Sequence, residues 1–172
     1  MKNKIILLLL LAFVFATSYS QDNKNKQDFN GLQKGLSVEI VFGVYNDDQY
    51  NHTFDAKERK WILKNGKLIY KIDAQIGAYS DTIKLTENDL TTITNFVKEN
   101  NLTSNINKNL NKDYLNKYEH TESIKGQLKY NNKIADFNII TNSSSSFDED
   151  TDAKLLKKLE NLLYKIIENY KK

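Results

Sequence analysis

The amino-acid sequence predicts an α+β domain in which a mostly antiparallel sheet, built from two hairpins and additional strands, is covered on one face by two helices. Three observations lead to this fold class. An Asn-Gly pair and an Asn-Asn pair each lie between two apolar segments, as loops of hairpins do. Two other segments carry apolar residues at helical spacing. The predicted order is strand, hairpin, strand, helix, hairpin, helix.

The first strand is predicted from Leu36. Apolar and polar residues alternate over residues 36–45, and only Val41 breaks the alternation. The apolar face consists of Leu36, Val38, Ile40, Phe42 and Val44. The sequence Asn46-Asp47-Asp48 predicts a turn, and residues 50–55 predict a second, short strand.

The first hairpin is predicted around Asn65 and Gly66, which tolerate the positive φ angles of a type I′ turn. Apolar residues on both faces of the hairpin indicate a central position in the sheet. Alternation over residues 79–85 predicts another strand. Counting outward from the turn pairs Leu63 with Leu68 and Trp61 with Tyr70 on one face, and Ile62 with Ile69 on the other.

A helix is predicted to begin after Thr86, because Thr86 and Asp89 have the spacing of a capping box. Asn100 and Asn101 indicate its end. Residues 103–120 are rich in asparagine, and they predict either a weak surface helix or a long loop. The apolar face of the helix consists of Leu90, Ile93 and Val97.

The second hairpin is predicted around Asn131 and Asn132, with Phe137 lying across from Gly126 to cover the gap that a strand glycine leaves. The same register pairs Ile124 with Ile139 and Leu128 with Ala135. Residues 143–146 predict a flexible loop. The last helix has the apolar stripe Leu155, Leu156, Leu159, Leu162, Leu163, Ile166, Ile167 and Tyr170.

The N-terminus is typical of a secretory signal peptide. Lys2 and Lys4 precede an apolar run that is too short to span a bilayer, and small residues follow at Ser18 and Ser20. We therefore expect a cleaved signal peptide at 1–20, a flexible leader at 21–34 and a single α+β domain at 35–172. The mature protein is then secreted or periplasmic and has no membrane span.

Charge and cysteine content exclude several functions. Without Lys2 and Lys4, 23 basic residues remain against 22 acidic residues, a balance that argues against nucleic acid as a partner and against attraction to anionic membranes. The chain has no cysteine, so disulfides, cysteine-ligated metals and thiol nucleophiles are excluded.

His120 is the candidate for acid-base catalysis, because Glu119 and Glu122 flank it. The alternative is a solvated strand entry, since the two glutamates point to different sides of an extended chain. His52 has no partner visible in the sequence. The motifs of serine hydrolases, zinc proteases and phosphate-binding loops are absent.

Asp148, Asp150 and Asp152 have the spacing of the first three ligands of a calcium loop. The match ends there, because Ala153 stands where the loop needs glycine and Leu159 where it needs glutamate. The same acids complement the N-terminal dipole of the last helix, and one of them can cap it. We therefore predict no metal and no cofactor.

Trp61 and Tyr70 are the candidate binding residues, as anchors of a platform for a sugar or a peptide. The alternative is that they belong to the core. Trp61 lies beside the Leu63–Leu68 pair on a hairpin face that the last helix can cover. We predict that Trp61 is a core residue.

The sequence favours an exported, non-catalytic binding protein that acts on another exported or cell-envelope protein as an inhibitor, immunity-type or accessory factor. One alternative is a small secreted hydrolase that uses a carboxylate pair or His120. A second alternative is a carbohydrate- or peptide-binding module. A cavity with converging carboxylates would favour the enzyme, whereas an exposed apolar sheet face or strand edge would favour a protein partner.

Overall fold

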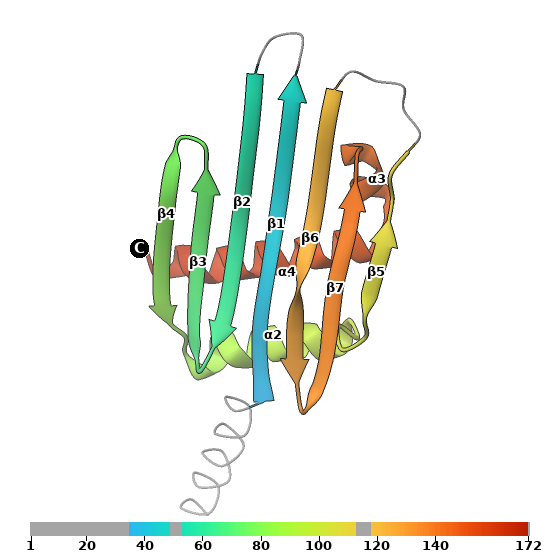
Figure 1. The fold of residues 1–172 in the computed structure, drawn as a ribbon. Coiled ribbons are helices and arrows are strands. Elements are labelled where there is room, and N and C mark those ends of the chain that lie inside the picture. Colours follow the sequence, from blue (N-terminus) through green and yellow to red (C-terminus); the bar gives the residue numbers. More distant parts are fainter. Residues whose placement is uncertain (1–34, 49–52, 113–117, 172) are drawn as a thin grey trace, which may run out of the picture. The chain divides into compact units, whose positions relative to one another are not determined.

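Seven strands form one sheet in the order β4-β3-β2-β1-β6-β7-β5 (Figure 1). The computed structural model describes residues 35–48, 53–112 and 118–171. The strands are β1 (Leu36–Asp48), β2 (Thr53–Lys64), β3 (Lys67–Ala74), β4 (Gly77–Lys84), β5 (Ile106–Asn109), β6 (Tyr118–Tyr130) and β7 (Lys133–Thr141). Neighbouring strands are antiparallel except β5 and β7, which run parallel. The predicted α+β class with a mostly antiparallel sheet is confirmed.

Both predicted hairpins form with the expected register. Asn65 and Gly66 join β2 to β3 with φ angles of 53° and 69°, and Asn131 and Asn132 join β6 to β7 with φ angles of 47° and 64°. Positive φ at both loop positions is what a type I′ turn requires. The six predicted pairs form: Leu63 with Leu68, Trp61 with Tyr70, Ile62 with Ile69, Ile124 with Ile139, Gly126 with Phe137, and Leu128 with Ala135.

The turn predicted at Asn46-Asp47-Asp48 is wrong, because β1 continues through these residues. They pair with β2 on one side and with β6 on the other. Ladder hydrogen bonds on both sides of β1 outweigh the local turn preference of asparagine and aspartate. The short strand expected at 50–55 is the beginning of β2, and residues 49–52 lie outside the described part of the chain.

Helix α2 (Glu87–Glu99) begins and ends as predicted. The amide of Asp89 donates to Thr86 Oγ1 at 3.2 Å, and the amide of Thr86 donates to Asp89 Oδ2 at 3.0 Å. This is the expected capping box. Asn100 is the C-cap, and Asn101 follows with a φ angle of 51°. The helix buries Leu90, Ile93, Thr94 and Val97.

Two segments differ from their predictions. Residues 103–120 form neither a surface helix nor simply a loop, because Ile106–Asn109 is β5 and β6 begins at Tyr118; residues 113–117 are not described. The serine run is not a flexible loop but begins helix α3 (Ser144–Glu149). Phe147 anchors α3 in the core with an exposed fraction of 1%. Neither the parallel partner of β5 nor this anchoring is visible in local composition.

Helix α4 (Thr151–Asn169) is capped by Asp150, whose Oδ1 accepts from the amides of Asp152 at 3.0 Å and Ala153 at 2.9 Å. Of the predicted stripe, Leu155 and Leu162 are only half-buried and Tyr170 is exposed. Within the described residues, no helix is long and apolar enough to cross a membrane. Helix α4 buries Ala153, Leu156, Leu159, Glu160, Leu163, Ile166 and Ile167.

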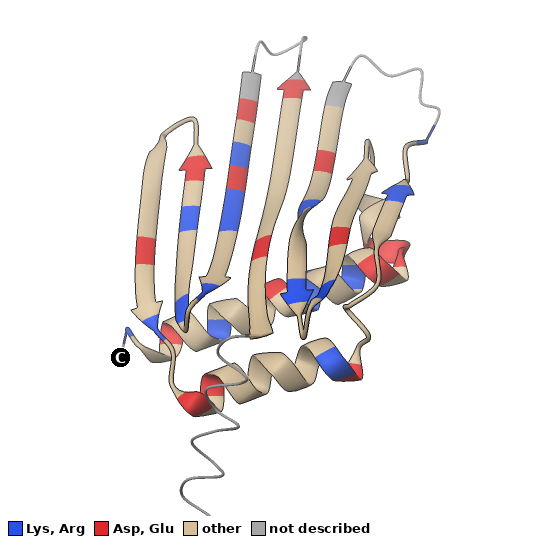
Figure 2. Cartoon of the chain, turned by 60° about the horizontal axis from the view of Figure 1, so that its bottom comes forward, with Lys and Arg blue, Asp and Glu red and all other residues tan. Residues whose placement is uncertain are grey.

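The two long helices lie behind the strands in Figure 1, and Figure 2 shows α2 and α4 on the same side of the sheet. The strand residues on this side form the core with the helices. They include Ile40, Trp61, Leu68, Leu128 and Ile139, all with an exposed fraction of 0%. The opposite sheet face, called the open face below, has no described helix over it.

Candidate functional site

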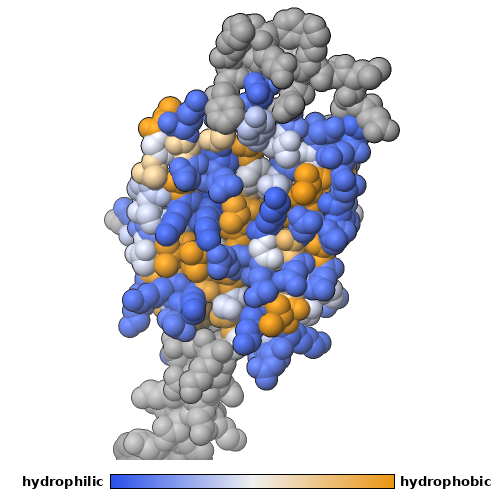
Figure 3. All heavy atoms as spheres, viewed as in Figure 1, coloured by the Kyte–Doolittle hydropathy of each residue, from blue (hydrophilic) through white to orange (hydrophobic). Residues whose placement is uncertain are grey.

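The open face carries alternating rows of lysine and isoleucine on β2, β3 and β4. The register places Lys64, Lys67 and Lys84 in one row, Ile62, Ile69 and Thr82 in the next, and Lys60, Lys71 and Ser80 in the third. Ile62 and Ile69 are half-buried between lysines that are mostly exposed. We call the five lysines together with Ile62 and Ile69 the lysine patch. Figure 3 shows this mixture of apolar and hydrophilic side chains on the open face.

Two hollows lie beside the patch. The first has a volume of about 500 Å³ and is lined by Val41, Ile62, Lys64 and Lys125, with the backbone at Gly126. The second has a volume of about 410 Å³, and its lining includes Gly43, Tyr45, Ala56, Glu58 and Asp73. The second hollow lies where side chains are small or missing, at Gly43, Ala56 and Ser123. The face therefore has shallow relief suited to contact with another molecule.

The lysine patch was not among the predicted sites, although the sequence contains a signal for it. The predicted pairing of Ile62 with Ile69 also places Lys60 opposite Lys71 and Lys64 opposite Lys67 on the same face. The missing information was that no described helix covers this face. Alternation alone cannot say which face of a strand with apolar residues on both sides is packed.

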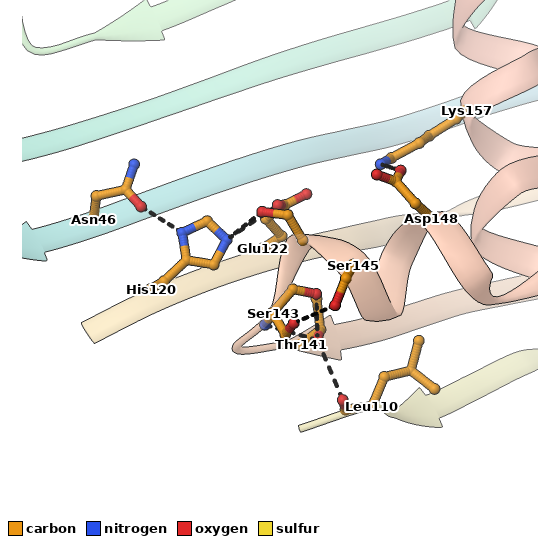
Figure 4. A network of polar contacts seen from close by, with 10 residues as sticks. Asn46, Leu110, His120, Glu122, Thr141, Ser143, Ser145, Asp148 and Lys157 are labelled. Carbon is orange, nitrogen blue, oxygen red and sulfur yellow. Dashed lines mark hydrogen bonds and ion pairs between the residues drawn. The ribbon is translucent and has the colours of Figure 1, made fainter. Parts of the chain in front are cut away.

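His120 lies on the helix-covered face of β6, opposite Asn46 of β1. Its Nδ1 contacts Asn46 Oδ1, and its Nε2 lies 3.0 Å from Glu122 Oε1 and 3.0 Å from Ser144 Oγ. Figure 4 shows the ring between Asn46 and Glu122. The side chain is 26% exposed. The structure thus brings Glu122 to His120, as strand spacing allows, and ties β1, β6 and α3 together.

The His120 cluster resembles a nucleophile, base and orienting residue, but its geometry does not activate Ser144. A serine nucleophile needs an unprotonated ring nitrogen to take its proton. Here the carboxylate of Glu122 shares Nε2 with Ser144, and a carboxylate is only an acceptor, so it favours a proton on that nitrogen. The arrangement therefore positions α3 against the strands. The side chain of Glu119 and all of His52 lie outside the described residues.

The three candidate calcium ligands form ion pairs with lysines. Asp148 pairs with Lys157 at 3.0 Å, and Lys108 pairs with both Asp150 at 2.6 Å and Asp152 at 2.7 Å. Burial acts to raise the pKa of Asp150, but hydrogen bonds from Lys108 and the helix amides lower it overall. The described residues contain no group of three or more histidine, cysteine or acidic side chains that could hold a metal ion.

Trp61 and Tyr70 are core residues, with exposed fractions of 0% and 4%. Their rings stack at 4.3 Å, and Tyr164 of α4 meets both rings edge-on. Burial, followed by the hydrogen bond with Tyr164, raises the pKa of Tyr70. The prediction that Trp61 belongs to the core is confirmed, and neither residue is available as an exposed binding anchor.

A partly buried ion pair between Arg59 and Glu160 links α4 to this aromatic cluster. Arg59 donates to both carboxylate oxygens of Glu160, at 2.8 Å and 3.1 Å, and Trp61 Nε1 donates to Glu160 Oε1 at 3.2 Å. The hydrogen bond to Glu160 is the main cause of the raised pKa of Arg59. Both oxygens of the Glu160 carboxylate thus accept hydrogen bonds from β2, which compensates the cost of burying the charge and holds α4 against the sheet.

No model of a protein family matches the chain, and no curated protein matches it significantly.

Proposed function

We propose that the protein is an exported, non-catalytic binding protein that docks another exported or cell-envelope protein on the open face of its sheet. It acts there as an inhibitor, an immunity-type protein or an accessory factor. The observation that carries the proposal is the row of Ile62 and Ile69 on a sheet face with no described helix over it.

On β1 the residue opposite Ile62 is Glu39, and Val41 stands in the neighbouring row, opposite Lys60. Val41 lies on the same face and lines the 500 Å³ hollow together with Ile62. Half-buried isoleucine and valine surrounded by polar side chains have the composition of a protein interface, with an apolar centre and a polar rim. Covering these apolar side chains with a partner removes apolar surface from water, which favours association.

Export is supported by the sequence from Lys2 to Ser20, which has the charged, apolar and small-residue regions of a signal peptide. An exported protein meets its partners in the periplasm or the medium. This is why we propose a partner that is itself exported or part of the cell envelope.

The hydrolase alternative has two supporting observations, and both are weaker. Ser144 reaches His120, but Glu122 shares the same ring nitrogen. Glu58 and Asp73 lie opposite each other beside the 410 Å³ hollow, but both are exposed. Exposed carboxylates lack the desolvation that separates a catalytic acid from its base.

The proposal is tested by affinity capture from the native cell envelope with the mature protein, Ile62→Asp and Ile76→Asp. Ile76 lies at the tip of the β3–β4 hairpin with an exposed fraction of 101%, so Ile76→Asp is a control with the same chemical change off the face. We expect a protein that is captured by wild type and Ile76→Asp and lost with Ile62→Asp. Retention by Ile62→Asp would contradict the proposal.

The fold of each variant is checked by the fluorescence of Trp61, which is the only tryptophan and is fully buried. If Ile62→Asp does not fold, Ile62→Thr takes its place. Threonine keeps the β-branched shape that suits a strand but presents a hydroxyl to the partner. The same loss of capture is expected.

A further inference from the structure

The lysine patch places like charges directly opposite one another on neighbouring strands. Lys60 faces Lys71, Lys64 faces Lys67, and Lys67 also faces Lys84. Directly opposed like charges destabilise an antiparallel sheet. Figure 2 shows these basic segments side by side on β2, β3 and β4.

The repulsion is poorly compensated within the described part of the protein. Lys60 pairs with Glu39 at 2.5 Å, whereas the other four lysines of the patch make no ion pair among the described residues. The open-face acids Glu58 and Asp73 lie two positions farther along β2 and β3, in a row of their own. The patch is therefore a local excess of positive charge in a chain that is almost neutral without its signal lysines.

We infer that the lysine patch binds an acidic segment of a protein, in which carboxylates bracket an apolar side chain. This inference rests on the proposed function and names the chemistry of the partner. The carboxylates neutralise the two lysine rows, and the apolar side chain covers Ile62 and Ile69. The opposed lysines cost stability in the free protein and are relieved in the complex.

The spacing of the rows defines the partner segment more closely. Lys60 and Lys64 are four residues apart on β2, with Ile62 midway. This separation is about 13 Å in an extended strand. An extended partner matches it when acidic residues four positions apart flank an apolar residue, because alternate side chains of a strand share one face.

The arrangement favours a protein over other anions. A nucleic-acid duplex presents its phosphates on the outside and keeps its base faces stacked inside, so it offers the isoleucine row little apolar surface. A bilayer offers both, but Ile62 and Ile69 are half-buried between lysines and do not project far enough to insert.

The test uses the mature protein labelled with ¹⁵N and a peptide in which glutamate, serine, valine and serine repeat. The control peptide has the same composition, with glutamate and valine on opposite faces of the extended chain. We expect the first peptide to shift the resonances of β2, β3 and β4, to bind more tightly than the control, and to weaken as salt rises. Equal binding of the two peptides would overturn the inference.

Two double variants separate the lysine patch from net charge. Lys60→Glu with Lys71→Glu changes the patch, whereas Lys154→Glu with Lys165→Glu makes the same change at exposed positions of α4. We expect roughly tenfold weaker peptide binding for the first variant and wild-type binding for the second. Equal weakening would overturn the inference, as would tighter binding of a DNA duplex or of vesicles of phosphatidylcholine and phosphatidylglycerol.

A single substitution tests whether the directly opposed lysines destabilise the free protein. Lys67 lies between Lys64 and Lys84 in the sheet register. Lys67→Glu therefore turns two repulsive pairs into two attractive pairs. We expect a higher unfolding midpoint together with weaker peptide binding. A lower midpoint, or unchanged peptide binding, would overturn the inference.

The failure of this inference is distinguishable from that of the proposed function. If Ile62→Asp abolishes capture of the cell-envelope partner while the lysine variants retain it, the face binds a protein but the lysines do not select it. If neither substitution affects capture, both proposals fail.

Discussion

Gly126 lies where β6 approaches β1 so closely that a side chain does not fit. A Cβ atom at this position would lie 2.2 Å from the carbonyl oxygen of Glu39 and 2.7 Å from Cα of Ile40. Both are backbone atoms of a central strand, which cannot move without disturbing the ladder on either side. The absence of a side chain at Gly126 is thus a requirement of the fold, and Phe137 pairs across from it.

We predict that Gly126→Ala lowers the free energy of unfolding by about 1–3 kcal/mol or more, the usual cost of an added group in a packed region. Urea denaturation followed by Trp61 fluorescence measures the loss. Gly43→Ala is the matched control, because its Cβ would meet only Ser123 Oγ at 2.9 Å, and that side chain can rotate away. Equal stability of Gly126→Ala and wild type would contradict the close approach.

Trp61 shows how much of a single residue's surroundings can be predicted from the sequence. Its burial followed from the hairpin face on which it lies and from the need of the last helix for an apolar partner. Its hydrogen bond to Glu160, a residue 99 positions away, could not be predicted, because the sequence does not fix how the helix is rotated over the sheet.

Elements defined by local chemistry were predicted well. The Asn65-Gly66 turn, the Asn131-Asn132 turn and the capping box of α2 each depend on residues a few positions apart. Elements that depend on distant partners were missed. The parallel pairing of β5 with β7 joins Ile106 to Phe137, and the continuation of β1 through Asn46 depends on strands on both sides.

The Asp150 cap of α4 predicts how the stability of the folded protein depends on pH. Asp150 accepts from two helix amides and pairs with Lys108, and together these interactions hold its pKa below the ordinary value of 3.8. A carboxylate with a lowered pKa stabilises the folded state fully above its unfolded pKa, and this contribution is lost as the pH falls through the folded value.

We therefore predict that Asp150→Ala lowers the free energy of unfolding by about 0.5–2 kcal/mol near neutral pH. The difference from wild type shrinks below about pH 4. Urea denaturation across this pH range measures it. Asp148→Ala is the control, because the Asp148 side chain is 72% exposed and its one ion pair among the described residues is with Lys157. A difference in the free energy of unfolding that grows on acidification would contradict the role of ionised Asp150 as the cap of α4.

At the scale of the whole molecule, the acidic and basic residues nearly balance in number but are not evenly distributed. The near balance of acidic and basic residues argued against nucleic acid and anionic membranes as partners. That average conceals five lysines gathered on β2, β3 and β4. The hairpin register places the lysines on one face, but only the arrangement of the helices leaves that face open. The fold class was thus readable from sequence, whereas the candidate site required the structure.

The central claim is that the open face of the sheet contacts the partner. Site-specific photo-crosslinking in the native cell envelope tests it most directly, with a photoreactive phenylalanine derivative replacing Ile69 on the open face or, as the control, Lys165 on the exposed side of α4. We expect a discrete crosslinked species from position 69 and none from position 165. A crosslink from position 165 with none from position 69 would contradict the claim.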